Sequence, residues 1–217
     1  MTIHYLDSQN SILLKFISEI RDVNLQKDKL RFRRNIERIG EILAYEMSKN
    51  IKYHSQMIST PLGTKQMALP DNNIVICSIL RAGLPLHQGV LNYFDDAENA
   101  FISAYRKYLK NTDKFEIIVE YLASPSLENK ILLLVDPMLA TGGSLISVYE
   151  TLKKIGTPKQ IHIFAVIGAL EGINYIKDKF PKDTHLWIAT VDKNLNKHGY
   201  IVPGLGDAGD LAYGTKL

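Results

Sequence analysis

The sequence predicts an α/β fold with a doubly wound, mostly parallel sheet. Five short apolar runs follow one another along the chain, at residues 74–80, 101–105, 131–135, 161–167 and 186–191. The runs are continuously apolar rather than alternating, which is typical of strands that are covered on both faces. Helical stretches separate several of them, as the crossovers between parallel strands require.

The helices between these runs are recognised from their spacing and their ends. Between the third and fourth runs, an apolar stripe recurs at helical spacing at Leu145, Val148, Leu152 and Ile155. Gly156 ends this stretch, and a second helical stretch at residues 171–180 is ended by Pro181. Because ligands of such sheets bind at the carboxyl ends of the strands, the loops that follow the runs are the expected functional segments.

The N-terminal segment, residues 8–50, is predicted to be helical. Its apolar stripe consists of Phe32, Ile36, Ile39, Leu43 and Met47. The same segment carries a basic run made of Lys27, Lys29, Arg31, Arg33, Arg34 and Arg38. One interpretation is a face for RNA or phosphate, and the favoured one is the solvated side of an amphipathic helix.

Two further segments interrupt the alternation of strands and helices within one predicted domain, residues 1–217. Residues 106–129 are long for a connection and contain strand-like alternation at 115–121, so we expect a protruding β-arm that could close over a site. Residues 193–217 hold five glycines with little periodicity and form a C-terminal segment.

Composition bounds the remaining possibilities. Of 217 residues, 46% are apolar and 23% are charged, which excludes a disordered chain. A net charge of +3 is too small to predict nucleic-acid binding, and the single cysteine, Cys77, excludes an internal disulfide and a cysteine metal cluster. Residues 1–10 do not resemble a secretory signal and residues 161–170 are too short to span a bilayer, so we expect a cytoplasmic protein without membrane contact.

The strongest local signal is residues 132–144 (LLLVDPMLATGGS), a buried strand followed by an acid and a small-residue turn that opens a helix. Gly142 and Gly143 allow successive N–H groups to face one concavity, where the helix dipole and nearby hydroxyls favour a phosphate. Asp136 is placed to accept hydrogen bonds from a sugar beside that phosphate. The alternative, a plain helix cap, explains the turn but not the whole string.

This string resembles the ribose-phosphate loop of the type I phosphoribosyltransferases, which bind 5-phosphoribosyl 1-diphosphate (PRPP). The single acid, followed by MLATGGS, resembles the form found in uracil phosphoribosyltransferases. The resemblance implies that these residues bind PRPP: Asp136, Pro137, Met138, Leu139, Ala140, Thr141, Gly142, Gly143 and Ser144.

Two arginines match further family positions. Residues 78–84 (SILRAGL) resemble the family's pyrophosphate loop, which implies that Arg81 contacts the diphosphate of PRPP. Arg106, after Tyr105, matches the second family arginine. The chain departs from the family pattern at Cys77-Ser78 and at residues 107–114, and the latter departure bears on the shape of the arm, its closure and any regulation by GTP.

The third element is residues 198–210 (HGYIVPGLGDAGD). It contains a GxGxxG pattern, but only eight residues follow Gly209, too few for the βαβ unit of a dinucleotide site. The string instead resembles the uracil-binding segment of uracil phosphoribosyltransferases. That resemblance implies uracil contacts at Ile201, Gly206, Asp207 and Ala208, and PRPP and metal contacts at Asp207.

The resemblance implies an enzyme of pyrimidine salvage that converts uracil and PRPP to UMP and diphosphate with Mg²⁺, as a homodimer or larger homo-oligomer. The residues implied in catalysis are Arg81, Arg106, Asp136 and Asp207. Asp207 is also the candidate base for the uracil N1 proton. Three alternatives stay open: a relative acting on another base, an RNA-binding regulator of pyrimidine genes on the same fold, and a silent relative.

Histidines and the cysteine are set aside as catalytic groups. The histidines at 54, 87, 162, 185 and 198 show no metal-ligand spacing. Cys77 lies in an apolar run, so a buried and inert thiol is predicted.

Overall fold

The computed structural model describes residues 1–71, 73–108 and 115–216, and of residues 105–108 and 115–119 it describes the backbone alone. Its centre is a sheet with the strand order β1-β10-β9-β7-β4-β5-β6, in which β8 also pairs with β9. The bounds are β1 Thr2–Tyr5, β4 Ile74–Leu80, β5 Glu98–Tyr108, β6 Phe115–Ala123, β7 Ile131–Val135, β8 Met138–Leu139, β9 Gln160–Ala169 and β10 His185–Asp192. All pairs are parallel except β5 with β6, so the predicted fold class is confirmed.

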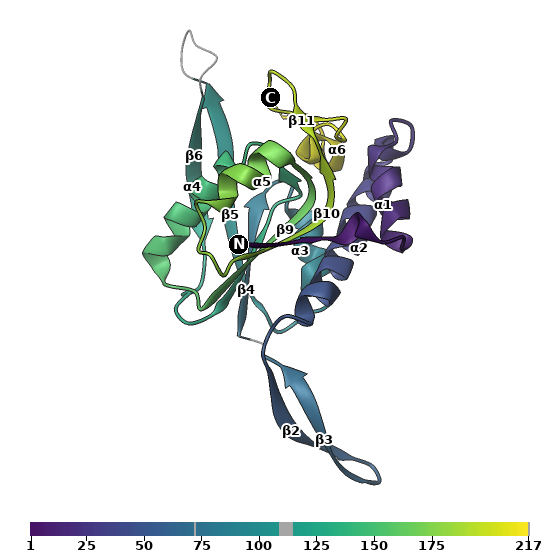
Figure 1. The fold of residues 1–217 in the computed structure, drawn as a ribbon, viewed down its shortest axis with the longest axis vertical. Coiled ribbons are helices and arrows are strands. Elements are labelled where there is room, and N and C mark those ends of the chain that lie inside the picture. Colours follow the sequence, from purple (N-terminus) through teal and green to yellow (C-terminus); the bar gives the residue numbers. More distant parts are fainter. Residues whose placement is uncertain (72, 109–114, 217) are drawn as a thin grey trace.

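Helices cover both faces of this sheet (Figure 1). One face packs against α1 (Ile12–Arg21), α2 (Lys29–Ser48) and α3 (Leu84–Leu91), and the other against α4 (Gly143–Leu152) and α5 (Leu170–Lys177). Successive β4 residues show the division, because Ile76 belongs to the first core and Cys77 to the second. The continuous apolar strands are therefore buried on both sides, as their composition predicted.

The N-terminal segment forms two helices with a break at residues 22–28. The Ser11 side chain accepts a hydrogen bond from the Leu13 N–H and caps α1, and the Asp28 side chain accepts one from the Arg31 N–H and caps α2. The predicted stripe of α2 lies in the core, with Phe32 and Leu43 no more than 1% exposed.

The arm predicted at residues 106–129 is longer and begins inside the sheet. β5 pairs with β4 on one side and with β6 on the other, so the hairpin continues the sheet rather than standing apart from it. Residues 109–114 of this prediction lie outside the described residues.

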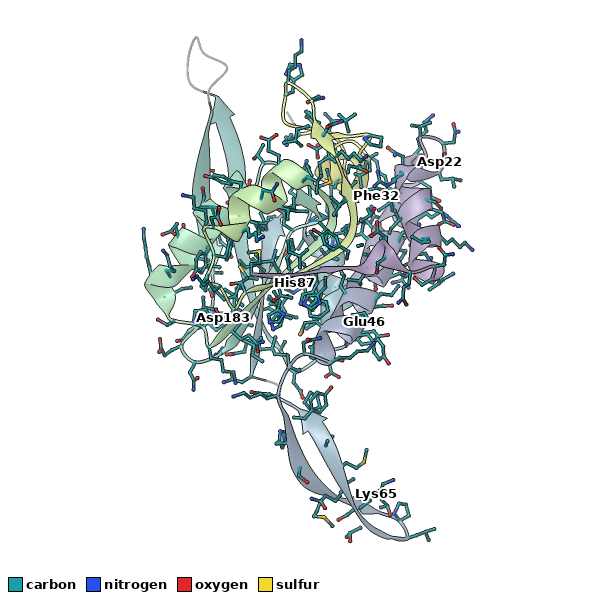
Figure 2. All side chains as sticks on the ribbon, in the orientation of Figure 1. Asp22, Phe32, Glu46, Lys65, His87 and Asp183 are labelled. Carbon is teal, nitrogen blue, oxygen red and sulfur yellow. The ribbon has the colours of Figure 1, made fainter. Side chains whose placement is uncertain are left out.

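The sequence did not predict a second hairpin. It projects from the end of the molecule that lies opposite the C-terminal segment (Figure 1). It pairs β2 (Tyr53–Thr60) with β3 (Gly63–Pro70), and a two-residue turn joins them. Figure 2 shows Lys65 far from the central sheet, and almost every residue of the two strands is exposed. Neither face of the hairpin is apolar, which explains why hydrophobic periodicity gave no signal.

The remaining elements are short. They are the 3₁₀ turns Leu6–Ser8, Leu25–Lys27 and Lys153–Ile155, the ladder β11 (Asn194–Leu195) with β12 (Ile201–Val202), and α6 (Ala208–Tyr213). Within the described residues, no helix is both long and apolar enough to cross a membrane.

Candidate active site at the carboxyl edge of the sheet

A cavity of about 740 Å³ lies at the carboxyl ends of the parallel strands, where the fold class places ligands. Its walls come from the segments after β4, within β5, after β7, and from the C-terminal segment. The lining residues at these places are Leu80, Arg81, Ala82, Ser103, Ala104, Asp136, Met138, Ala140, Ser144, Tyr200, Ile201, Gly206, Asp207, Ala208 and Lys216. Three motifs that are distant in sequence therefore meet at one site.

The loop after β7 leads into the N-terminus of α4, a helix of ten residues. Gly142 precedes the helix with a φ of +80°, and a Cβ added there would lie 2.7 Å from Ile176 Cγ2. Glycine is therefore required both by the backbone conformation and by the packing of α5. Gly142 has no side chain with which to cap α4, and the Gly143 N–H makes only a long contact of 3.5 Å with Thr141 Oγ1, so the N–H groups of the first turn can bind an anion.

Asp136 follows the last residue of β7 and is 9% exposed. One of its carboxylate oxygens accepts a hydrogen bond from the Met138 N–H at 3.1 Å. Burial raises the pKa of the carboxyl group to about 6, although the Met138 hydrogen bond opposes the rise. A buried carboxylate that faces the cavity with unfilled acceptor positions suits the hydroxyl groups of a sugar.

Arg81 follows β4 and already has protein partners. Its guanidinium donates to Asp210 Oδ1 at 2.9 Å and to the Gly214 carbonyl at 3.2 Å. The turn beneath it needs a glycine, because a Cβ at Gly83 would lie 2.6 Å from the Ile79 carbonyl oxygen. A diphosphate at Arg81 would therefore compete with Asp210 for the guanidinium.

The C-terminal segment brings Asp207 to the cavity at the start of α6. Asp207 Oδ1 accepts a hydrogen bond from the Asp210 N–H at 3.0 Å, and Oδ2 lies 3.7 Å from Lys216 Nζ. Gly206 has a φ of +95°, a conformation that side chains disfavour, so this position leaves the backbone uncovered beside the cavity.

The cavity gathers most, but not all, of the predicted residues. Four of them belong to the loop that leads into α4 but are not among the described residues that line the cavity: Pro137, Thr141, Gly142 and Gly143. Leu139 is 1% exposed and packs into the core beneath the loop, so its side chain faces away from the site. Arg106 lies in β5 with its backbone paired to Ile117, and its side chain lies outside the described residues. Its role stays a prediction.

Sequence reasoning missed several lining residues. Ser103 and Ala104 flank a register shift between β5 and β6, a kind of irregularity that often occurs beside active sites. Tyr200 is 45% exposed and lines the same cavity. Lys216 reaches the site from near the end of the chain, and no local pattern marks it.

The basic run of α2 is engaged within the protein. Arg31 donates to Glu19 and Arg34 to Glu37, and the other two arginines also have partners: Arg33 with the Ala212 carbonyl and Arg38 with Asn35. These contacts favour the structural interpretation of the run over an RNA-binding face.

Cys77 and the histidines were not predicted to be catalytic, and none of them is among the described residues that line the cavity. Cys77 is fully buried, as predicted, and burial raises its thiol pKa to about 12, which favours an unreactive thiol. Among the described residues, no three His, Cys, Asp or Glu side chains converge to hold a metal ion.

A mostly parallel sheet that carries a phosphate-type loop, a buried acid and an arginine at its carboxyl edge defines the class of type I phosphoribosyltransferases. Residues 8–215 match the family model described as uracil phosphoribosyltransferase. The chain therefore belongs to the uracil phosphoribosyltransferase family, as its motifs predicted.

Curated relatives agree with this assignment, and a solved structure shares the fold. The chain is 51% identical over 217 residues to the uracil phosphoribosyltransferase of Porphyromonas gingivalis (strain ATCC 33277), with 100% of both sequences covered. It is 38% identical over 216 residues to that of Thermococcus sibiricus, covering 98% of this chain and 90% of the relative. The solved structure of the AQ2163 protein from Aquifex aeolicus superimposes with a TM-score of 0.86 at 31% identity, over 100% of both chains. The predicted enzyme class is confirmed.

Proposed function

We propose that this enzyme joins N1 of uracil to C1 of the PRPP ribose, releasing diphosphate and giving UMP. The observation that carries the proposal is the single cavity that unites the α4 loop, Asp136, Arg81 and the glycine-rich segment at residues 199–209. No protein nucleophile is required, because the bond from C1 to diphosphate breaks as the bond to N1 forms. Catalysis then consists of positioning and electrostatic stabilisation.

The phosphate end of PRPP is assigned to the start of α4. The first turn of α4 borders the cavity at Ser144, and its N–H groups have no capping side chain from Gly142. The helix dipole adds to their attraction for an anion. The ribose then lies against Asp136, whose carboxylate accepts hydrogen bonds from the ribose hydroxyls.

The diphosphate end is assigned to Arg81, with Arg106 as the second cation from the family resemblance. Binding there requires Arg81 to exchange Asp210 for the diphosphate. The exchange favours the substrate, because a diphosphate offers several charged oxygens to a guanidinium whose side chain is 41% exposed.

Mg²⁺ fits this site as a partner of the substrate. Asp207 offers a carboxylate at the cavity, and Mg²⁺ commonly combines one or two carboxylates with substrate phosphates and water. We assign Asp207 to that ion, which would neutralise charge on the leaving diphosphate.

Uracil is assigned to the segment that holds Ile201, Gly206 and Ala208. A backbone left uncovered at Gly206 can approach a planar base and read its donor and acceptor edge with main-chain groups. The N1 proton must be removed, and Asp207, through its metal ion or a water, is the assigned base. We place the reaction in the cytoplasm, the compartment expected from the sequence.

Kinetics of two cavity variants test these assignments separately. Arg81→Gln is expected to raise the KM for PRPP about tenfold or more while the KM for uracil changes little. Ala208→Val, which reduces the space assigned to the base, is expected to raise the KM for uracil while the KM for PRPP changes little. Equal effects of both variants on both KM values would contradict the division of the site. Omission of Mg²⁺ from the assay with uracil and PRPP tests the metal assignment, because UMP formation should then be lost.

We also propose that the enzyme is a homo-oligomer whose subunits meet through the β2–β3 hairpin. The hairpin exposes large apolar side chains, with Met57 60% and Leu62 101% exposed, in a segment that contributes little to the core. These apolar side chains alternate with polar ones, and packing of a second copy against the hairpin would remove them from water. Met57→Glu is expected to lower the mass measured by light scattering toward that of one chain, and an unchanged mass would contradict the proposal.

A further inference from the structure

The two peptide groups that meet at Gly204 in the C-terminal segment are each held by a charged side chain. The Gly204 N–H donates to Asp192 Oδ2 at 2.9 Å, and the Gly204 carbonyl accepts a hydrogen bond from Arg21 Nη1 at 3.1 Å. Gly204 has a φ of +61°, and a Cβ there would lie 2.1 Å from the Ile201 carbonyl oxygen. The turn from Ile201 to Gly204 is therefore tight and its orientation is fixed by these two contacts.

Arg21 and Asp192 form a two-pronged ion pair. Arg21 Nη1 lies 2.8 Å from Asp192 Oδ2, and Arg21 Nη2 lies 3.0 Å from Oδ1. Asp192 is the last residue of β10 and Arg21 is the last residue of α1, so the pair joins the sheet edge to the N-terminal helices. The side chains are 10% and 22% exposed respectively, which shields the pair from water.

The pair lies outside the cavity but directly behind its wall. Among the described residues that line the cavity, neither Arg21 nor Asp192 occurs, whereas Ile201 and Gly206 flank the clamped peptide on both sides. Any effect of the pair on the reaction must therefore pass through the segment.

Other supports act on either side of Gly204: β12 (Ile201–Val202) pairs with β11, and Ile201 and Leu205 are buried in the core. Upstream, Asn196 Oδ1 accepts hydrogen bonds from the His198 and Tyr200 N–H groups. Downstream, α6 is anchored to α2, where Arg33 donates to the Ala212 carbonyl. Gly204 lies between these anchors, and its N–H and carbonyl are held by Asp192 and Arg21.

We propose that Arg21 and Asp192 are positioning residues that fix the backbone at Gly204 and thereby set the affinity of the site for the base. This inference rests on the proposed assignment of uracil to residues 199–209. A base read by main-chain groups depends on where the backbone lies, because displacements well under 1 Å lengthen the hydrogen bonds that recognise it.

Arg21→Gln tests the inference, and Arg31→Gln is its matched control. Arg31 forms an equivalent two-pronged pair with Glu19, at 3.0 and 2.8 Å, but joins α2 to α1 without touching the C-terminal segment. We expect Arg21→Gln to raise the KM for uracil about tenfold, with the KM for PRPP within about twofold of the wild-type value. Arg21→Lys keeps the positive charge but cannot bind both Asp192 oxygens in the same way. It is expected to raise the KM for uracil less than Arg21→Gln does.

Hydrogen exchange of the free enzyme gives a second readout that does not depend on any substrate. Arg21→Gln is expected to increase the exchange rate of amides in residues 199–209 about tenfold, whereas Arg31→Gln leaves it unchanged. If exchange in Arg21→Gln were as slow as in the wild type, the pair would not hold the backbone at Gly204. If exchange were faster but the KM for uracil unchanged, the pair would have no role in binding the base. An equal rise of the uracil KM in Arg31→Gln would also overturn that role. If the wild-type enzyme used a different base, the proposed substrate would fail, and the exchange measurement would still decide whether the pair holds the segment.

Discussion

The buried acid at the end of β7 makes a prediction in which stability and activity move in opposite directions. Burial raises the pKa of Asp136 from the ordinary value of 3.8 to about 6, because the ionised form loses its hydration in the folded protein. Asp136 therefore favours folding most below pH 3.8, and this contribution is lost as the pH rises toward 6 and beyond. The difference corresponds to about 3 kcal/mol at about 1.4 kcal/mol per pH unit.

Asp136→Asn removes the charge while it retains an oxygen that can accept the Met138 N–H. We expect the variant to be more stable than the wild type above pH 7 by up to about 3 kcal/mol, with a smaller difference at pH 4. The same change deprives the ribose of a charged acceptor, so kcat/KM should fall by about a hundredfold or more.

The assay is denaturant unfolding of both proteins between pH 4 and 8, together with the rate of UMP formation. Asp96→Asn, at an exposed carboxylate between α3 and β5, is the control for loss of a negative charge. A variant that is less stable than the wild type at pH 8, or a difference that does not grow with pH, would refute the reasoning. Retained activity would refute the assignment of Asp136 to the ribose.

Three further predictions follow from single contacts. Gly142→Ala places a Cβ 2.7 Å from Ile176 Cγ2 at a φ of +80°, so we expect a loss of about 2 kcal/mol in unfolding free energy and a raised KM for PRPP; a variant with wild-type stability would contradict the packing argument. Asp210→Asn weakens the partner of Arg81 and is expected to lower the dissociation constant for diphosphate severalfold in titration calorimetry, so weaker binding would show that Asp210 helps rather than competes. Burial lowers the pKa of His162 to about 3, so its contribution to stability is present above pH 6.5 and is lost as the pH falls below it, by up to about 5 kcal/mol near pH 3. In His162→Asn, the unfolding free energy should therefore fall less steeply below pH 6.5 than in the wild type. An unchanged pH dependence would show that His162 is not the cause of the loss.

The parts of the fold that the sequence predicted are those in which local composition determines the structure. Continuous apolar runs such as residues 131–135 have no stable position except between two layers of helices, so the central strands could be identified individually. The loop after β7 could also be predicted, because the adjacent glycines Gly142 and Gly143 indicate a tight turn before the helix.

The parts that were missed depend on contacts between distant residues or on the absence of a core. The β2–β3 hairpin buries neither face, so no periodicity distinguishes it from a loop. β1 has only four residues and is held by its pairing with β10, with His4 opposite Trp187. The contacts of Arg81 with Asp210 and of Arg21 with Asp192 span more than a hundred positions, and only the folded chain brings them together.

The central claim is that the cavity at the carboxyl edge of the sheet unites uracil with PRPP. Formation of labelled UMP from labelled uracil, PRPP and Mg²⁺ tests it most directly, with orotate, hypoxanthine and adenine assayed in parallel. The account predicts a nucleotide product with uracil, at least about a hundredfold more than with the other bases, and loss of that product in Asp136→Asn. Turnover of another base in preference to uracil, or no product from folded wild-type protein, would contradict it.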